Sequence, residues 1–210
     1  MSKTSVSYQD LNPASFLERT AMVYPDKPAV VYNGRALSYA EFHERSRKLA
    51  SALQSVGVGK GDRVAFLCPN VPPMLEGYFG PLGIGAVLVA LNTRLSPAEV
   101  SYIFNHSGAK ILIFDSEFSP TVKSIIEETS SVETYVHVLD THSKDPNIPG
   151  PDYESFINGS NPIPKLNGPD SELDTIAINY TSGTTGLSLI HISEPTRRYA
   201  ISYAVFCLKK

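Results

Sequence analysis

The chain has 210 residues, of which 42% are hydrophobic and 19% charged, and it includes 14 Gly and 16 Pro. This composition is typical of a folded globular protein and excludes a disordered chain, a collagen and a coiled coil. The formal net charge of −3 favours neither nucleic acid nor an anionic membrane as a partner. The two cysteines, Cys68 and Cys207, are too few for a disulfide framework and show no paired metal-ligand spacing, so we expect no metal site.

The longest apolar stretch, residues 81–91, is about half the length that a transmembrane helix needs. The first ten residues also lack the basic and then apolar layout of a secretory signal. We therefore expect a cytoplasmic protein without a transmembrane segment. The sequence carries no signal for the oligomeric state.

The N-terminal quarter of the chain predicts a helix, a hairpin and a second helix. An Asn-Pro pair at residues 12–13 is typical of a helix start, and apolar residues then recur at helical spacing to residue 23. An Asn-Gly pair separates the apolar runs 29–32 and 36–39, which predicts a tight β-hairpin. The capping-box pattern of Ser38 and Glu41 predicts a helix that ends before Gly57.

From residue 63 onward, short apolar runs alternate with helical patterns. The expected strands cover 63–67, 86–90, 110–114 and 134–139, and the expected helices cover 71–83, a segment that starts at Ser96-Pro97, and 120–129. This alternation predicts βαβ units. The expected fold class is therefore α/β, a doubly wound and mostly parallel sheet with flanking helices.

Residues 140–172 interrupt this pattern, because they are rich in Pro, Asn, Asp and Ser and contain only a weak helical pattern near 153–157. We interpret them as an irregular connection on the surface. A buried strand is then expected over 174–180, and the segment 173–186 combines this strand with a polar loop.

That loop holds four hydroxyl side chains and two glycines: Thr181, Ser182, Gly183, Thr184, Thr185 and Gly186. Glycine lets backbone amides approach an anion, and hydroxyls donate further hydrogen bonds, so phosphate is the expected ligand. A Walker loop is excluded, because no Gly-Lys-Ser/Thr follows at the required spacing. From composition alone, the same residues also fit an ordinary flexible turn.

The string Tyr180-Thr-Ser-Gly-Thr-Thr-Gly186 resembles the nucleotide-phosphate loop of the adenylate-forming (AMP-binding) acyl-CoA synthetase and ligase superfamily. Residues 11–19, 69–72, 91–95 and 106–110 resemble successive landmarks of its fatty-acyl-CoA synthetases. The resemblance implies that residues 1–186 are an incomplete part of the large N-terminal domain of an adenylating enzyme.

The resemblance also implies a reaction. In that family the loop helps to hold the β- and γ-phosphates of ATP while the carboxylate of a small carboxylic acid attacks the α-phosphate, and Mg²⁺ offsets the charge on the phosphate oxygens. The products are an acyl-adenylate and pyrophosphate, and the acyl group then passes to coenzyme A. The expected cofactors and co-substrates are thus ATP, Mg²⁺ and coenzyme A, and a fatty-acid-type substrate is favoured. None of the residues present is assigned a catalytic role.

The sequence departs from the family after Leu187. The family continues with Pro-Lys-Gly, whereas this chain has Ser188-Leu-Ile190. Residues 187–210 resemble the translation of a widely used transposase sequencing-library adapter, so we interpret them as a non-native tail. The tail holds four of the 18 basic residues and one of the 21 acidic ones, which leaves 14 and 20 in residues 1–186, a net charge of −6. We expect the 210-residue chain to be inactive.

Two other functions stay open. The chain can be a nucleotide-binding or interaction module without ligase activity, or it can belong to another adenylating branch such as the aryl-acid ligases. The remaining polar candidates receive structural interpretations. His43, His106 and His137 lack a carboxylate or Cys at ligand spacing, Arg94 is expected to brace a loop, and Asn70 is expected to cap a helix.

Overall fold

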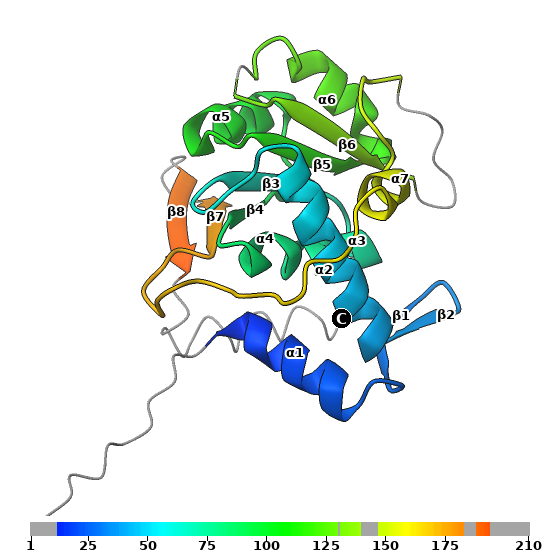
Figure 1. Cartoon of the computed structure of the whole chain (residues 1–210). Coiled ribbons are helices and arrows are strands. Elements are labelled where there is room, and N and C mark those ends of the chain that lie inside the picture. The colour runs from blue at the N-terminus through cyan, green and yellow to red at the C-terminus, as the bar shows by residue number, and fades with distance from the viewer. Residues whose placement is uncertain (1–11, 130, 140–146, 183–187, 194–210) are drawn as a thin grey trace, which may run out of the picture.

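The computed structural model describes residues 12–129, 131–139, 147–182 and 188–193. Within these residues the strands form a two-stranded hairpin and a six-stranded sheet, and the order in the larger sheet is β6-β5-β3-β4-β7-β8 (Figure 1). The hairpin consists of β1 (Pro28–Tyr32) and β2 (Arg35–Ser38). The strands of the large sheet are β3 (Arg63–Leu67), β4 (Val87–Ala90), β5 (Ile111–Asp115), β6 (Thr134–Val138), β7 (Ala177–Ser182) and β8 (Ser188–Ser193).

The first five strands of the large sheet are parallel, as the sequence predicted. β3 lies between β4 and β5, β6 continues beyond β5, and β7 pairs with β4. Only β8, which falls in the segment 187–210, runs antiparallel, along the outer edge of β7. Residues 1–186 thus supply every parallel strand that the structure describes.

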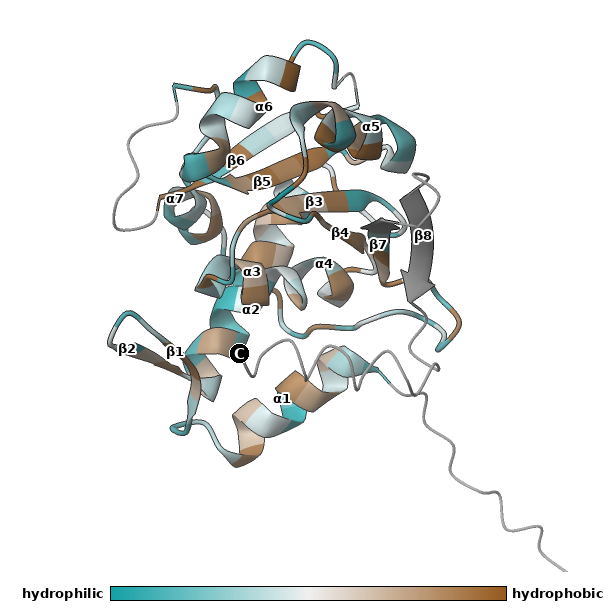
Figure 2. Cartoon of the chain, turned by 180° about the vertical axis from the view of Figure 1, so that it is seen from behind, coloured by the Kyte–Doolittle hydropathy of each residue, from teal (hydrophilic) through white to brown (hydrophobic). Residues whose placement is uncertain are grey.

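Helices cover both faces of this sheet. The described helices are α1 (Pro13–Val23), α2 (Tyr39–Ser55), α3 (Pro72–Gly77), α4 (Gly80–Gly83), α5 (Pro97–Ser107), α6 (Ser119–Ile125), α7 (Tyr153–Asn158) and the 3₁₀ turn η1 (Ser116–Phe118). Of these, α1 packs on α2 rather than on the sheet (Figure 1). Val64 and Phe66 of β3 pack with residues of α2, α3 and α7, whereas Ala65 and Leu67 pack with residues of α5 and α6. The alternation of side chains along a strand therefore divides the core between two layers of helices. Figure 2 shows the apolar colour of β3, β4 and β5 between these layers.

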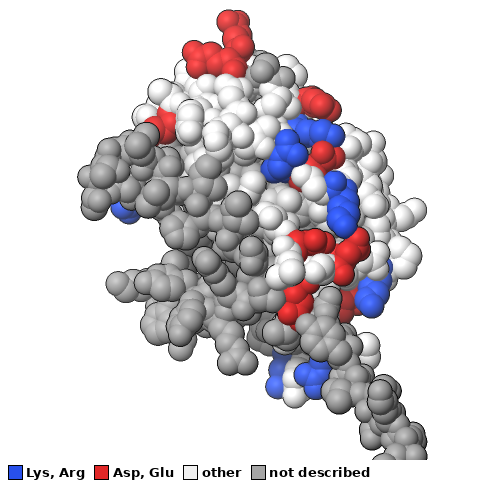
Figure 3. All heavy atoms as spheres, turned by 90° about the vertical axis from the view of Figure 1, so that its left-hand side faces the viewer, with Lys and Arg blue, Asp and Glu red and all other residues white. Residues whose placement is uncertain are grey.

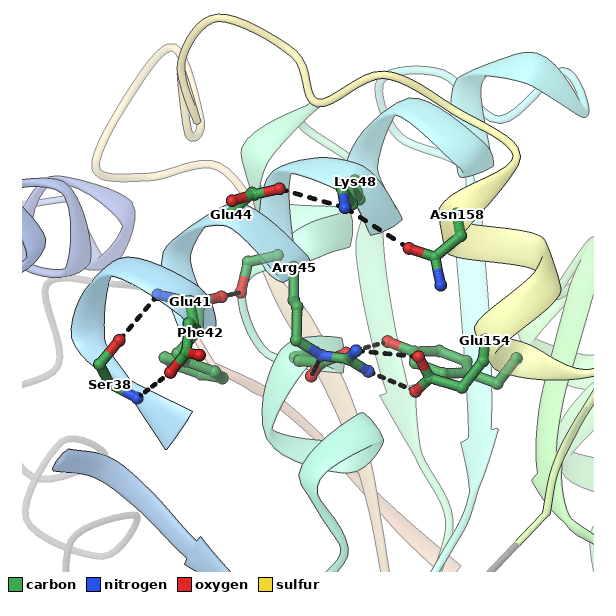
Figure 4. Close-up of polar contacts among 11 residues, drawn as sticks. Ser38, Glu41, Phe42, Glu44, Arg45, Lys48, Glu154 and Asn158 are labelled. Carbon is green, nitrogen blue, oxygen red and sulfur yellow. Dashed lines mark hydrogen bonds and ion pairs between the residues drawn. The ribbon is translucent and has the colours of Figure 1, made fainter. Parts of the chain in front are cut away.

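Local signals in the sequence account for several boundaries. The Asn12 side chain accepts a hydrogen bond from the Ala14 amide at the start of α1 (2.9 Å). The predicted capping box of Ser38 with Glu41 is formed at α2 (Figure 4), and Ser96 with Glu99 forms another at the predicted helix start of α5. These side chains satisfy amides that the first turn of a helix leaves unpaired.

Two expected helices were wrong in extent. The segment predicted as one helix over 71–83 forms α3 and α4 instead, because Pro81 has no N–H to continue the helical hydrogen bonds. The helix expected over 120–129 starts earlier, after η1, and ends at Ile125. Proline at the first turn is compatible with this earlier start.

The connection 140–172 is less superficial than predicted. Residues 140–146 lie outside the described part, but Tyr153, Ile157 and Leu166 are fully buried. The Leu166 amide also donates to Glu18 Oε1 of α1 (2.8 Å). Tyr153 and Ile157 fall in the weak helical pattern near 153–157, and Leu166 stands alone among polar residues, so the polar composition of the segment suggested the surface.

No helix among the described residues is long and apolar enough to cross a lipid bilayer. On the face shown in Figure 3, acidic and basic side chains lie interspersed rather than in one large patch of a single sign.

Candidate functional site

The candidate site lies at the edge of the sheet where the parallel strands end. From β3 the chain crosses to β4 on one side and then returns to β5 on the other side, so the crossover direction reverses between β3 and β4. Open α/β sheets bind ligands at the carboxyl ends of the strands near such a reversal. β7 lies next to β4 and is parallel to it, so its carboxyl end reaches the same edge.

The predicted phosphate loop begins at this edge. The parallel register pairs Ala90 with Asn179, and β7 continues through Thr181 and Ser182. Gly183, Thr184, Thr185 and Gly186 lie outside the described residues. The structure therefore brings the first two loop residues to the carboxyl edge of the parallel sheet.

The turn after β4 occupies the same edge. The Arg94 side chain is exposed and does not brace this turn in the way that the sequence suggested. Its backbone amide instead donates to Asn92 Oδ1 (3.0 Å), which closes the turn. An Asn side chain commonly stabilises a turn through the amide two residues later.

The turn after β3 also differs from the sequence interpretation. Val71, not Asn70, is the N-cap residue of α3, and no side chain caps this helix. Pro72 and Pro73 occupy its first positions and have no N–H to cap, while the Met74 amide donates to the Val71 carbonyl (3.0 Å). The first turn of α3 therefore leaves few free backbone amides for a capping side chain to accept hydrogen bonds from.

Cys68, which follows β3, is buried and is not disulfide-bonded. Burial, with the negative charge of Asp115 nearby, raises the pKa of its thiol well above the usual value. The protonated thiol is not a nucleophile. Asp115, at the end of β5, accepts a hydrogen bond from the Glu117 amide (3.0 Å) and so caps η1.

A ring cluster lies beside the entry to the predicted loop. His106 Nδ1 is 2.8 Å from the hydroxyl oxygen of Tyr180, and the His106 ring stacks on Tyr102 one helical turn earlier in α5, with ring centroids 5.4 Å apart. Sequence reasoning identified no function for His106. No local pattern could reveal a partner that is 74 residues away.

The other two histidines make structural contacts. His43 Nε2 lies 2.9 Å from Glu18 Oε1, which joins α2 to α1. His137 is buried in β6, and its ring packs against Phe114 of β5, with centroids 6.4 Å apart. These contacts agree with the structural interpretation of both residues.

The donor types at the candidate site suit phosphate. Backbone amides and hydroxyl groups bind phosphate oxygens well where a strand leads into a Ser/Thr/Gly-rich segment. Among the residues that the structure describes, no group of three or more His, Cys, Asp or Glu side chains is arranged to hold a metal ion.

Two cavities, of about 420 and 350 Å³, lie at the opposite edge, where the strands begin. Both include Lys60 and Gly85 in their walls, next to the starts of β3 and β4. Lys60 Nζ contacts Asp170 Oδ2 at 2.5 Å, so its charge is already paired. These cavities are separate from the candidate phosphate site.

A family model described as AMP-binding enzyme matches residues 17–188. The long-chain-fatty-acid–CoA ligase of Thermus thermophilus is 39% identical over 183 residues, which cover 85% of this chain and 32% of that protein. The 4-hydroxybutyrate–CoA ligase 2 of Metallosphaera sedula is 34% identical over 190 residues, covering 86% of this chain and 33% of that protein. The chain thus spans about a third of the length of these curated relatives.

Solved structures show the same fold. The anthranilate CoA ligase AuaEII in complex with anthranoyl-AMP has a TM-score of 0.84 at 24% identity, over 97% of this chain and 38% of that one. The Mycobacterium tuberculosis fatty acyl CoA synthetase has a TM-score of 0.73 at 27% identity, over 92% of this chain and 37% of that one. The parallel sheet and its helices therefore match the N-terminal domains of adenylate-forming enzymes.

Proposed function

Because the chain belongs to the AMP-binding enzyme family, we propose that residues 1–186 are part of an ATP-dependent acyl-CoA synthetase. The complete enzyme would convert a carboxylate and ATP into an acyl-adenylate and pyrophosphate, and then transfer the acyl group to coenzyme A. The observation that carries this proposal is the position of the string Tyr180–Gly186. It directly follows Asn179, the last residue of β7 that pairs with β4, at the carboxyl edge of a parallel sheet. Two similar proteins that are named as CoA ligases support the proposal.

The proposed role of Thr181, Ser182, Gly183, Thr184, Thr185 and Gly186 is to bind the β- and γ-phosphates of ATP. Nucleotidyl transfer asks a protein mainly for positioning and for stabilisation of charge. Hydroxyls and amides supply positioning but no positive charge, and Mg²⁺ bound with the nucleotide would supply part of that charge. Since the family's loop lysine is absent here, we infer that the 210-residue chain itself is inactive.

For the substrate, we favour a fatty-acid-type carboxylate. Support comes from the 39% identity to the Thermus thermophilus long-chain-fatty-acid–CoA ligase and the 27% identity to the Mycobacterium tuberculosis fatty acyl CoA synthetase. An aryl-acid branch is the alternative, since relatives also include a trans-cinnamate:CoA ligase of Petunia hybrida at 33% identity.

Residues 187–210 are proposed to be a non-native tail. The family match ends at residue 188, two residues after the predicted loop, which supports a change of origin at this point. The cytoplasm is the proposed compartment, although several relatives carry the word peroxisomal in their names.

The test is to express the complete reading frame from the source gene and measure pyrophosphate release from ATP with a panel of fatty and aryl acids. We expect release with fatty acids and dependence on Mg²⁺. Release with aryl acids alone would favour the other branch. A product that binds ATP but releases no pyrophosphate with any acid would contradict the ligase proposal and support a binding module.

A further inference from the structure

The ring cluster of Tyr102, His106 and Tyr180 joins α5 to the last residue before the predicted phosphate loop. Tyr180 packs partly buried against the core cluster beneath α5, and its hydroxyl meets His106 Nδ1 at 2.8 Å. The rings of His106 and Tyr180 meet edge to face with centroids 5.9 Å apart, while Tyr102 stacks on His106. The Tyr180 ring is therefore held by packing and by one directional hydrogen bond.

Tyr180 occupies a special position in the strand. The parallel pairing of β7 with β4 runs from Ala177 to Asn179 and ends there. Beyond that point β7 pairs only with β8, which belongs to the segment 187–210. On the side of the central sheet, Tyr180 is thus the first residue of β7 outside the ladder, and its side chain connects the strand to α5.

The partner on α5 is itself firmly placed. Val100, Ile103 and Phe104 bury the inner face of this helix. At its C-terminus, the Arg63 guanidinium donates from Nε to the Ser107 carbonyl (2.6 Å) and from Nη2 to the Gly108 carbonyl (2.7 Å). These bonds satisfy carbonyls that the end of a helix leaves unpaired. His106 therefore lies on a helix end that is tied to the start of β3.

The contact survives a change in the charge of His106. Neutral imidazole with its proton on Nε2 accepts the phenol proton at Nδ1, whereas imidazolium donates from Nδ1 to the phenol oxygen. Burial, with the neighbouring Tyr102, raises the pKa of Tyr180, so the phenol keeps its proton at neutral pH. Either form of His106 thus has a partner.

We propose that His106 is a positioning residue, which holds the Tyr180 hydroxyl and thereby fixes the chain where it enters the predicted phosphate loop. A role of His106 in ATP binding rests on the proposed function, whereas the contact that holds Tyr180 does not depend on it. Because His106 and Tyr180 contact each other, we expect their effect on the reaction to pass through the placement of Thr181 and Ser182.

The first test measures amide hydrogen exchange in the 210-residue chain. Tyr180→Phe keeps the ring and removes the hydroxyl, and His106→Ala removes the partner. Both should accelerate exchange at residues 180–182 about 3- to 10-fold, the effect of losing one hydrogen bond, while exchange at Leu112 and Ile113 of β5 stays unchanged.

His106→Asn places a polar atom near the position of Nδ1 and should restore most of the protection. Tyr102→Phe is the matched control, because it removes a hydroxyl from the same cluster and keeps the ring stacked on His106. Three results would contradict the proposal that His106 anchors Tyr180. Exchange could be unchanged in Tyr180→Phe, Tyr102→Phe could have an equal effect, or residues 180–182 of the wild type could already exchange at free-peptide rates.

The second test uses the complete enzyme. Tyr180→Phe and His106→Ala should raise KM for ATP about 3- to 10-fold and leave KM for the carboxylate unchanged, and His106→Asn should lie near wild type. Equal rises in both KM values would contradict a role at the phosphate loop. If the wild-type enzyme releases no pyrophosphate, the proposed function fails, and the exchange experiment still decides on the anchor.

Discussion

At the scale of single residues, the carboxyl of Glu76 has no exposed surface and therefore needs partners within the protein. It contacts Arg45 Nε at 2.5 Å and accepts a hydrogen bond from the Tyr153 hydroxyl (2.6 Å). Arg45 also pairs with Glu154, which is half exposed, as Figure 4 shows. Burial raises the pKa of Glu76, and the positive charge of Arg45 opposes that rise. The network ties α7, and with it the irregular connection, to α2 and α3.

We expect Arg45→Met to lower the free energy of unfolding by about 3–5 kcal/mol, because it leaves the Glu76 carboxyl buried with only Tyr153 as a partner. The triple variant Arg45→Met, Glu76→Leu, Tyr153→Phe removes every buried polar member and should recover most of this loss. Urea unfolding of the purified chain measures both values.

Lys48→Met is the control for the Arg45 experiment. Lys48 lies on the same helix and pairs with Glu44 at 3.1 Å, but this pair is at the surface. Its loss should cost less than about 0.5 kcal/mol. A triple variant that is as unstable as Arg45→Met would show that the shape of these side chains, and not an unpaired charge, determines the loss.

The lowered pKa of the Asp62 carboxyl makes the free energy of unfolding depend on pH. Burial acts to raise the pKa of this carboxyl, but hydrogen bonds from the Gly59 amide and Lys110 Nζ, both 2.9 Å long, outweigh burial and lower it. A carboxyl with a lowered pKa in the folded state stabilises the fold above its ordinary value of 3.8, and this contribution is lost as the pH falls through the folded value.

Asp62→Asn should therefore cost about 1 kcal/mol at pH 7, and the difference from wild type should shrink as the pH falls below about 4. Urea unfolding at pH 7, 5 and 3.5 provides the measurement. A difference that stays constant over this range would mean that the charge of Asp62 contributes nothing.

At the scale of elements, most helices and strands could be predicted, because their signals are local. The capping box of Ser96 and Glu99 and the apolar run 63–67 each place an element within a residue or so of where it lies. The contact of Arg45 with Glu76 could not be predicted, since the partners are 31 residues apart. The division of 71–83 into two helices has a local cause in Pro81, but how closely α4 approaches α2 depends on packing against distant residues.

Gly80 shows this dependence on packing. A Cβ at this position would lie 2.6 Å from Cγ and Cδ2 of Leu49, a fully buried residue of α2. Only glycine lets α4 approach α2 this closely. Gly80→Ala should therefore cost about 1–3 kcal/mol, measured by thermal or urea unfolding.

Gly59→Ala is the matched control for Gly80, because a Cβ there would meet only Asp62 Oδ2, at an ordinary 3.9 Å. We expect a change of less than about 0.5 kcal/mol. If Gly80→Ala proves equally mild, Leu49 must move aside at little cost, and close packing would not explain why the two helices meet here.

At the scale of the whole molecule, the candidate site could be predicted in part. The hydroxyls and glycines of 181–186 are residue types that suit a phosphate-binding loop, which stays a prediction, and the order of parallel strands brings Thr181 to the carboxyl edge of the sheet. The sequence could not predict that His106 would meet Tyr180, because this contact exists only after β7 has been placed beside β4.

The origin of residues 187–210 is the last question at this scale. The family match ends at residue 188, and β8, the only antiparallel strand described in the large sheet, falls in this segment. If the tail is translated adapter DNA, the gene itself must continue differently after Gly186. We predict that amplifying intact source DNA across these codons, without a transposase-made library, will reveal Pro-Lys-Gly and a long open reading frame. The loop would then regain the lysine whose charge the proposed chemistry needs. Recovery of the same Ser188-Leu-Ile190 codons would instead make the tail genuine and favour a nucleotide-binding module over a ligase.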